Sequence, residues 1–146
     1  DPTTRRLTLP DRNVVLLTDT VGFIRKLPPT IVTAFRATLE ELPEANILLH
    51  VVDLTSHNAP EQCRTVEDIL ADLNLTDKPR ITALNKIDLL LDNGKAWDEE
   101  SAINYLSDRG DVINENTVLI SAEKRWGLAK LLETLSRRLS PAAQPV

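Results

Sequence analysis

Four consecutive residues in the second half of the chain, Asn85-Lys86-Ile87-Asp88, have the types and order that can recognise a purine base. The Asp88 carboxylate can accept hydrogen bonds from a ring N–H and an exocyclic amine, a donor pair that guanine has and adenine lacks. A site built to bind such a pair rejects analogues without it by roughly 10⁴ or more. Asn85 would bridge neighbouring loops, and the Lys86 stem would cover the face of the base. The same residue types are common in solvated turns, so the motif alone leaves both interpretations open.

A second motif, Asp19-Thr20-Val21-Gly22, follows an apolar run near the start of the chain. An Asp at the end of a strand can hold Mg²⁺ through a water molecule, because this ion prefers oxygen ligands and keeps several waters. A glycine three residues later lets a backbone N–H approach a terminal phosphate. These residues also suit a capped turn, so the motif alone does not separate phosphate sensing from a structural role.

A third and weaker motif, Ser121-Ala122, follows the last apolar run. Here the Ala122 backbone N–H would donate a hydrogen bond to the O6 atom of guanine. The three motifs occur in a fixed order, each at the end of an apolar run, and that combination is unlikely to arise by chance. Together they predict a guanine-nucleotide site.

The elements that must position these residues are buried strands. The runs at 47–52, 81–84 and 118–120 are apolar throughout rather than alternating, which is typical of parallel strands covered on both faces. Polar residues follow each of them, beginning with Asp53 after the first. Ligands of open α/β sheets bind outside the carboxyl ends of the strands, so these polar residues are expected to meet at one edge.

Residues 6–10 and 13–18 are expected to form an antiparallel pair around a turn at 10–12. Amphipathic helices are expected between the strands, because apolar residues there recur at spacings of three and four. They are predicted after Pro28-Pro29 up to Leu42, from near Pro60 to Leu73, from near Asp98 to Gly110, and over 128–139. This alternation predicts an α/β fold, a three-layer arrangement in which helices cover both faces of a mostly parallel sheet.

The composition sets outer limits on function. The chain has 146 residues and a formal net charge of −5, which disfavours a dedicated nucleic-acid-binding surface. Its four glycines fit no glycine-rich phosphate loop, and its single cysteine fits a reducing compartment such as the cytoplasm. The apolar runs are too short to span a membrane. Because the chain has no methionine and opens on Asp1, we expect it to be a piece of something longer.

The segments DPTTRRL (1–7), LTDTVGFIRKLP (17–28) and AFRATLEE (34–41), with the NKID and SA motifs, resemble the HflX translational GTPases. The resemblance runs from Asp1 to about Leu139. It implies a P-loop GTPase domain with strand order 2-3-1-4-5-6, with GTP or GDP and Mg²⁺ as ligands. It also implies a cytoplasmic role on the large ribosomal subunit and its rRNA, where the family splits stalled or idle ribosomes. Residues 1–139 would be the C-terminal portion of the GTPase domain, and 140–146 a frayed tail.

The resemblance also implies a role for each matched residue. Asp1 would end the first switch segment, and Asp19 would hold Mg²⁺ through water. Phe23 stands where Ras-type GTPases have a water-positioning Gln, so slow hydrolysis that depends on a partner is expected. The residues that would contact GTP are Asp1, Asp19, Thr20, Val21, Gly22, Asn85, Lys86, Ile87, Asp88, Ser121, Ala122 and Glu123.

The first strand and helix of such a domain, and the P-loop ligands they carry, would precede Asp1. That strand is central, so its loss would separate two strands and leave apolar edges that invite swapping, self-association or a partner strand. We therefore expect this polypeptide alone to be inactive or weakly active, unless the other half of the domain accompanies it. A non-catalytic interaction module that retains the fold remains the alternative. A phosphatase with an aspartyl nucleophile is disfavoured, because Asp19-Thr20-Val21 lacks the paired second Asp.

Overall fold

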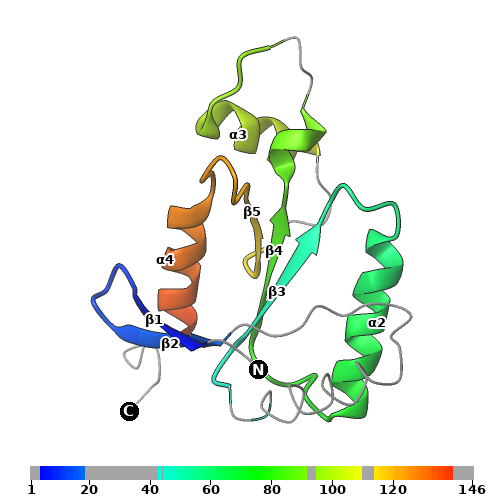
Figure 1. The fold of residues 1–146 in the computed structure, drawn as a ribbon, viewed down its shortest axis with the longest axis vertical. Coiled ribbons are helices and arrows are strands. Elements are labelled where there is room, and N and C mark those ends of the chain that lie inside the picture. The colour runs from blue at the N-terminus through cyan, green and yellow to red at the C-terminus, as the bar shows by residue number, and fades with distance from the viewer. Residues whose placement is uncertain (1–3, 19–42, 44, 92–94, 110–113, 140–146) are drawn as a thin grey trace.

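The structure of the chain, a computed structural model, describes residues 4–18, 43, 45–91, 95–109 and 114–139. Figure 1 shows the order of the elements and the thin grey trace of the remaining residues. The elements are β1 (Thr4–Thr8), β2 (Val14–Thr18), β3 (Leu48–Asp53), α2 (Ala59–Asp72), β4 (Arg80–Asn85), the 3-10 helix η2 (Ile87–Leu90), α3 (Glu99–Arg109), β5 (Thr117–Leu119) and α4 (Leu128–Leu139).

The three apolar runs form one parallel sheet in the order β3-β4-β5. In the central strand, β4, Ile81 and Ala83 are fully buried on one face, and Thr82 and Leu84 are half-buried on the other. The register pairs Asp53 with Asn85 and Leu84 with Leu119, so the three strands end close to one another. The prediction of buried parallel strands is confirmed.

Strands β1 and β2 form a separate antiparallel sheet, as the sequence predicted. β1 begins and ends two residues earlier than expected, because Leu9 and Pro10 belong to the turn. Arg12 closes that turn in the left-handed region, with φ of 71°, and its N–H donates to the Leu9 carbonyl at 2.8 Å. The Asp11 carboxylate accepts the Asn13 N–H at 3.1 Å and completes the turn.

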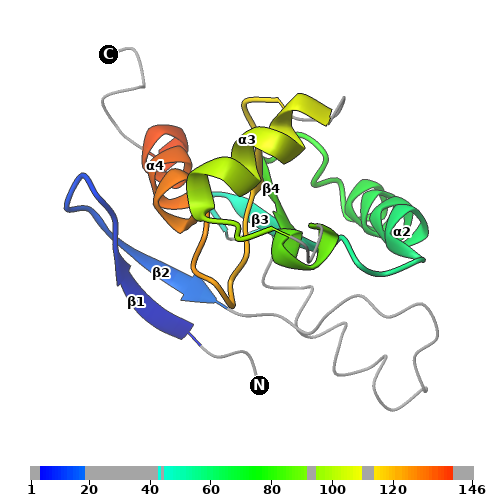
Figure 2. The same cartoon turned by 90° about the horizontal axis from the view of Figure 1, so that it is seen from above.

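Helices cover both faces of the parallel sheet. Seen from above, α4 and α2 lie on opposite sides of β3 and β4, and the hairpin of β1 and β2 lies beside α4 (Figure 2). One buried cluster joins the sheet, α4 and the hairpin, and includes Ile81, Leu135 and Leu9. The other joins β3 to α2 through Leu48, Val66 and Leu70. The expected three-layer α/β fold is therefore present in the described part of the chain.

The helices predicted near 60–73, 98–110 and 128–139 are confirmed as α2, α3 and α4. The helix expected between Pro28-Pro29 and Leu42 and the tail at 140–146 lie outside the described residues. No helix within the described ranges is long and apolar enough to cross a membrane.

Two apolar strand edges have no partner strand among the described residues. β2 pairs only with β1, and β3 pairs only with β4. Val14, Leu16 and Leu17 of β2 are exposed, Leu16 to 70%, and so is Val51 of β3. The orders β1-β2 and β3-β4-β5 are compatible with the 2-3 and 4-5-6 parts of the expected order 2-3-1-4-5-6.

Candidate base-binding site

Two of the three motifs meet at the carboxyl edge of the parallel sheet. Asn85 is the last residue of β4, and Ser121 lies two residues beyond β5, the neighbouring strand. The backbone joins the two loops, because the Ile87 N–H donates to the Ile120 carbonyl at 3.3 Å and the Ile120 N–H donates to the Leu84 carbonyl at 2.9 Å. The strands of Figure 1 point toward this edge, where α3 also lies.

Asn85 links the loops through its side chain, as its expected bridging role requires. Its Oδ1 accepts hydrogen bonds from the Lys86 N–H at 2.8 Å and from the Ala122 N–H at 3.0 Å. The Ala122 N–H was expected to face the O6 atom of a guanine base. In this structure the amide oxygen of Asn85 takes that donor instead.

The Asp88 side chain is held by the loop that follows β5. The Ser121 hydroxyl donates to Asp88 Oδ1 at 2.8 Å, and Ser121 is fully buried. The Ser121 oxygen also accepts the Lys124 N–H at 3.1 Å, which fixes the hydroxyl from its own loop. Asp88 Oδ2 receives no hydrogen bond from any residue that the structure describes. One carboxylate oxygen is thus anchored while the other remains available to a donor.

Lys86 makes an ion pair that the sequence did not suggest. Its backbone is left-handed, with φ of 71°, and its Nζ lies 3.0 Å from Asp53 Oδ2. Asp53 Oδ1 accepts the Thr55 N–H at 2.9 Å and the Thr55 hydroxyl at 2.6 Å. The hydrogen bond from the Thr55 hydroxyl, then the one from Lys86, lowers the pKa of Asp53 to about 2. The position of Asp53 at a strand end was the only signal in the sequence for this residue.

The loop after Ser121 has a shape that demands Gly127. Ser121 and Trp126 exchange backbone hydrogen bonds of 3.0 Å, and Gly127 follows with φ of 74°. A Cβ at Gly127 would lie 2.1 Å from the Leu119 carbonyl oxygen, a separation that no real Cβ adopts. The Gly127 N–H donates to Glu99 Oε2 at 2.7 Å, so α3 is tied to the base-binding loop.

The remaining candidate residues are not all brought into this cluster. Ile87 is fully buried, so its side chain anchors the turn, and Glu123 is exposed. Outside the described residues lie Asp1, Asp19, Thr20, Val21, Gly22 and Phe23. Within the described ranges, no three His, Cys, Asp or Glu side chains lie close enough together to hold a metal ion. Asp19, the predicted Mg²⁺ residue, lies outside those ranges.

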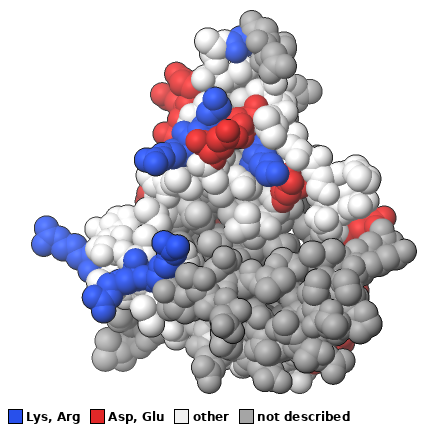
Figure 3. Space-filling view, in the orientation of Figure 1, with Lys and Arg blue, Asp and Glu red and all other residues white. Residues whose placement is uncertain are grey.

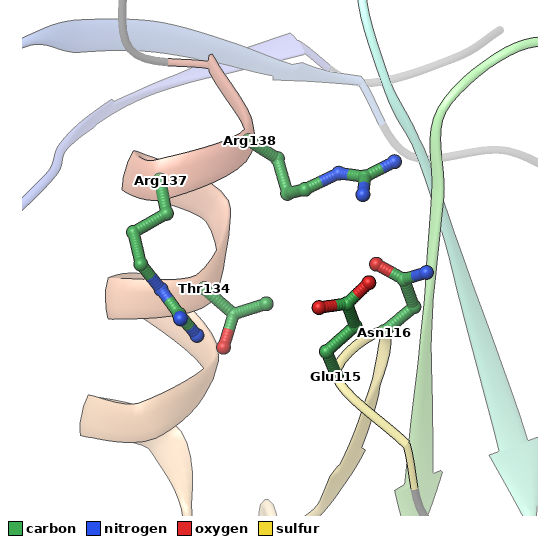
Figure 4. A pocket seen from close by; sticks show the side chains of 5 residues that line it. All are labelled: Glu115, Asn116, Thr134, Arg137 and Arg138. Carbon is green, nitrogen blue, oxygen red and sulfur yellow. The ribbon is translucent and has the colours of Figure 1, made fainter. Parts of the chain in front are cut away.

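A small cavity of about 90 Å³ lies at the opposite edge of the sheet, before β5 begins. Glu115, Asn116 and Arg138 face one another across it, with Thr134 and Arg137 on α4 (Figure 4). It is separate from the loops that carry Asn85 and Ser121.

Comparison with known proteins identifies the family. The chain is 45% identical over 139 residues to GTPase HflX of Caldanaerobacter subterraneus subsp. tengcongensis, which covers 95% of this chain and 28% of that protein. It is 38% identical over 140 residues to GTPase HflX of Escherichia coli K12, covering 96% of this chain and 30% of that one. The family described as 50S ribosome-binding GTPase matches residues 1–86. The chain belongs to the HflX GTPases.

The fold agrees with that membership. A crystal structure of a GTP-binding protein from Sulfolobus solfataricus in complex with GDP superposes with a TM-score of 0.69 and 32% identity. That match covers 94% of this chain and 44% of the archaeal one. This HflX chain spans less than a third of the length of the two relatives named above. The family match at 1–86 includes Asp19 to Gly22 and ends within the Asn85 motif.

Proposed function

We propose that this HflX chain is the guanine-selecting part of a GTPase that hydrolyses GTP to GDP on the large ribosomal subunit and splits stalled or idle ribosomes. The observation that carries the proposal is the pair of side-chain links across the sheet edge. Ser121 holds Asp88 at 2.8 Å, and Asn85 holds Ala122 at 3.0 Å. Two loops from neighbouring strands are thereby fixed as one surface.

Base selection follows from the state of Asp88. Its Oδ1 is held by Ser121, so the carboxylate cannot rotate freely away from the edge. The ring N–H and exocyclic amine of guanine would then meet a carboxylate with a fixed orientation. Adenine would leave that carboxylate without donors, and an unpaired charge in a closed site is strongly unfavourable.

The Ala122 N–H gives a second point of discrimination. In the structure it donates to Asn85 Oδ1, which also accepts the Lys86 N–H. We propose that guanine O6 takes the Ala122 donor when a base binds, while Asn85 keeps its bond to Lys86. The exchange costs little, because one carbonyl-type acceptor replaces another.

Phosphate chemistry would come from the segment outside the described residues. Asp19 would hold Mg²⁺ through water, and the Gly22 N–H would approach the γ-phosphate. The bound ion would supply charge neutralisation on the phosphate oxygens. Phe23 offers no hydrogen bond to orient the attacking water, so hydrolysis would be slow until a partner supplies that function. Asp1 would be the last residue of the first switch segment.

The chain itself has no glycine-rich loop to cradle the β-phosphate, and we propose that residues 1–139 work as the C-terminal portion of a larger GTPase domain. The strand that carries such a loop would join the free edges of β2 and β3. Residues 1–146 alone would then bind nucleotide weakly and hydrolyse none.

The exposed arginines of the β1–β2 hairpin support a contact with ribosomal RNA. Arg5, Arg6 and Arg12 are exposed there, and Figure 3 shows Lys and Arg side chains gathered over this part of the molecule. The whole chain carries −5, so this cationic hairpin runs against the overall charge. Phosphate groups bind such arginines through charge-assisted hydrogen bonds. Ribosomes would place the protein in the cytoplasm.

The test is hydrolysis by the complete gene product, with GTP or ATP, with and without large ribosomal subunits. We expect GTP to be hydrolysed slowly alone and much faster with the subunits, and ATP to be left intact in both cases. Asp19→Asn should abolish the stimulated rate while leaving GDP binding measurable. Equal rates with GTP and ATP would contradict guanine selection. No hydrolysis of either nucleotide, or no nucleotide binding at all, would favour the non-catalytic interaction module instead.

A further inference from the structure

We propose that Asp53 is the positioning residue for Lys86: it draws the lysine ammonium to the end of β3, so that the stem lies across the carboxyl edge as a fixed wall for the base. The inference rests on the function proposed above, because it concerns the same base-binding edge. It adds a residue from β3 to a site otherwise built from the loops after β4 and β5.

Sheet register brings the two residues together. Asp53 pairs with Asn85 across β3 and β4, so Lys86 lies one position beyond that pair. Adjacent strands are about 4.8 Å apart, a gap that an extended lysine stem can cross. The Nζ to Oδ2 distance of 3.0 Å shows that Lys86 does cross it. The four methylene groups therefore run along the edge rather than out into solvent.

The carboxylate is rigid before it meets the lysine. Thr55 donates to Asp53 Oδ1 from its N–H and from its hydroxyl, which leaves Oδ2 for Lys86. The Leu54 N–H donates to the Asn85 carbonyl at 3.2 Å, which ties the end of β3 to the end of β4. Asp53 also stays charged at neutral pH, since its pKa is about 2.

The lysine is fixed at its other end as well. Its left-handed backbone and the hydrogen bond from its N–H to Asn85 Oδ1 set the direction in which the side chain leaves the loop. With both ends held, few conformations remain open to the stem between them. A lysine side chain that is not held in this way loses rotamer entropy when it is ordered. The ion pair with Asp53 orders the Lys86 side chain before a base binds. Because the ordered stem covers the base, we expect a bound nucleotide to dissociate more slowly.

The experiment measures dissociation of fluorescent GDP from the complete gene product by stopped flow. The side chains of Lys86 and Asp53 are 47% and 38% exposed, so the pair is partly screened. Asp53→Asn should therefore speed dissociation by roughly two- to fivefold, the range expected of a screened pair. The matched control is Asp68→Asn on the exposed face of α2, which should leave the rate unchanged.

A double-mutant cycle separates positioning from a purely structural role. Lys86→Met keeps the apolar stem and removes the ammonium, so Asp53→Asn should add nothing in that background. An equal effect of Asp53→Asn with and without Lys86→Met would overturn the proposal, as would an unchanged rate in the single variant. If Asp53→Asn does not fold, Thr55→Val frees the carboxylate and should speed dissociation by a smaller factor, again only when Lys86 is present.

The wild-type protein distinguishes this inference from the function on which it rests. A wild type that fails to bind GDP would overturn the proposed guanine site. A wild type that binds GDP, with variants that release it at the wild-type rate, would overturn only the role of Asp53.

Discussion

The base-binding edge and the free strand edges of this molecule are built in opposite ways. At the first, Asn85, Asp88 and Ser121 are linked across two loops by hydrogen bonds of 2.8–3.0 Å. At the second, β2 and β3 have unpaired edges, and side chains such as Leu16 and Val51 are exposed. The difference teaches that the loops after β4 and β5 are held together by contacts among the described residues, whereas β2 and β3 each have one strand edge without such contacts.

The largest expected effect on stability is at Gly127, which shapes the loop after Ser121 at the carboxyl edge of the sheet. Gly127→Ala should lower the free energy of unfolding by about 3 kcal/mol or more, because its Cβ would collide with the Leu119 carbonyl and its φ is positive. Urea denaturation measures this change. Arg125→Gly, at a neighbouring residue with φ of 63°, is the control and should change stability by less than about 1 kcal/mol. Equal effects from the two substitutions would contradict the assigned geometry.

The next effect concerns the free edges. If further elements cover the exposed face of β2 in the complete gene product, Leu16→Asp should lower the free energy of unfolding by about 2 kcal/mol there, because a buried Leu would become charged. Leu89→Asp is the control, since Leu89 is 62% exposed on η2 away from these edges, and it should cost less than about 0.5 kcal/mol. If Leu16→Asp proves as harmless as the control, this face of β2 stays uncovered in the complete gene product.

Removing one link of the base-binding edge should have a moderate effect. Ser121→Ala deletes the donor to Asp88 and the acceptor for the Lys124 N–H in a fully buried position. We expect GDP affinity to fall about tenfold, as for the loss of a hydrogen bond to a charged group. Isothermal titration of the complete gene product measures it, with Ser107→Ala on the exposed face of α3 as the control. Unchanged affinity would mean that Asp88 needs no support.

The smallest effect is the acid response of Asp53. Its pKa falls from 3.8 to about 2 on folding, so its carboxylate stabilises the folded state above pH 3.8 and loses that contribution as the pH falls through about 2. The stability difference between wild type and Asp53→Asn should thus be constant from neutral pH to about pH 5 and shrink below it. Urea midpoints measured along this series check the sign. A difference that grows in acid would refute the lowered pKa.

Residue type and strand position together predicted much of the site. Asn85, Asp88 and Ser121 were found because each follows a buried run, and neighbouring parallel strands end at one edge. The hairpin was predicted from its turn, although its first strand ends at Thr8 because Pro10 has no N–H for the ladder. The parallel sheet followed from runs without polar alternation.

The rest depended on contacts between distant parts of the chain. The pairing of Asp53 with Lys86 follows from the register of β3 against β4, which no local pattern encodes. The link from Glu99 to Gly127 joins α3 to a loop beyond β5 in the same way. The hydrogen bond from the Ala122 N–H to Asn85 Oδ1 likewise joins two loops that are far apart in the sequence, and the contact of this N–H with a base stays a prediction.

The most direct test of the account exchanges the base that the edge selects. Asp88→Asn replaces the two carboxylate acceptors with one acceptor and one donor, which suits xanthine, whose C2 carries an oxygen in place of the amine. Dissociation constants of GDP and XDP are measured for both forms of the complete gene product. The account predicts that the variant loses GDP affinity by roughly 10² or more and gains affinity for XDP. A variant that keeps the wild-type preference for GDP would show that Asp88 does not read the base.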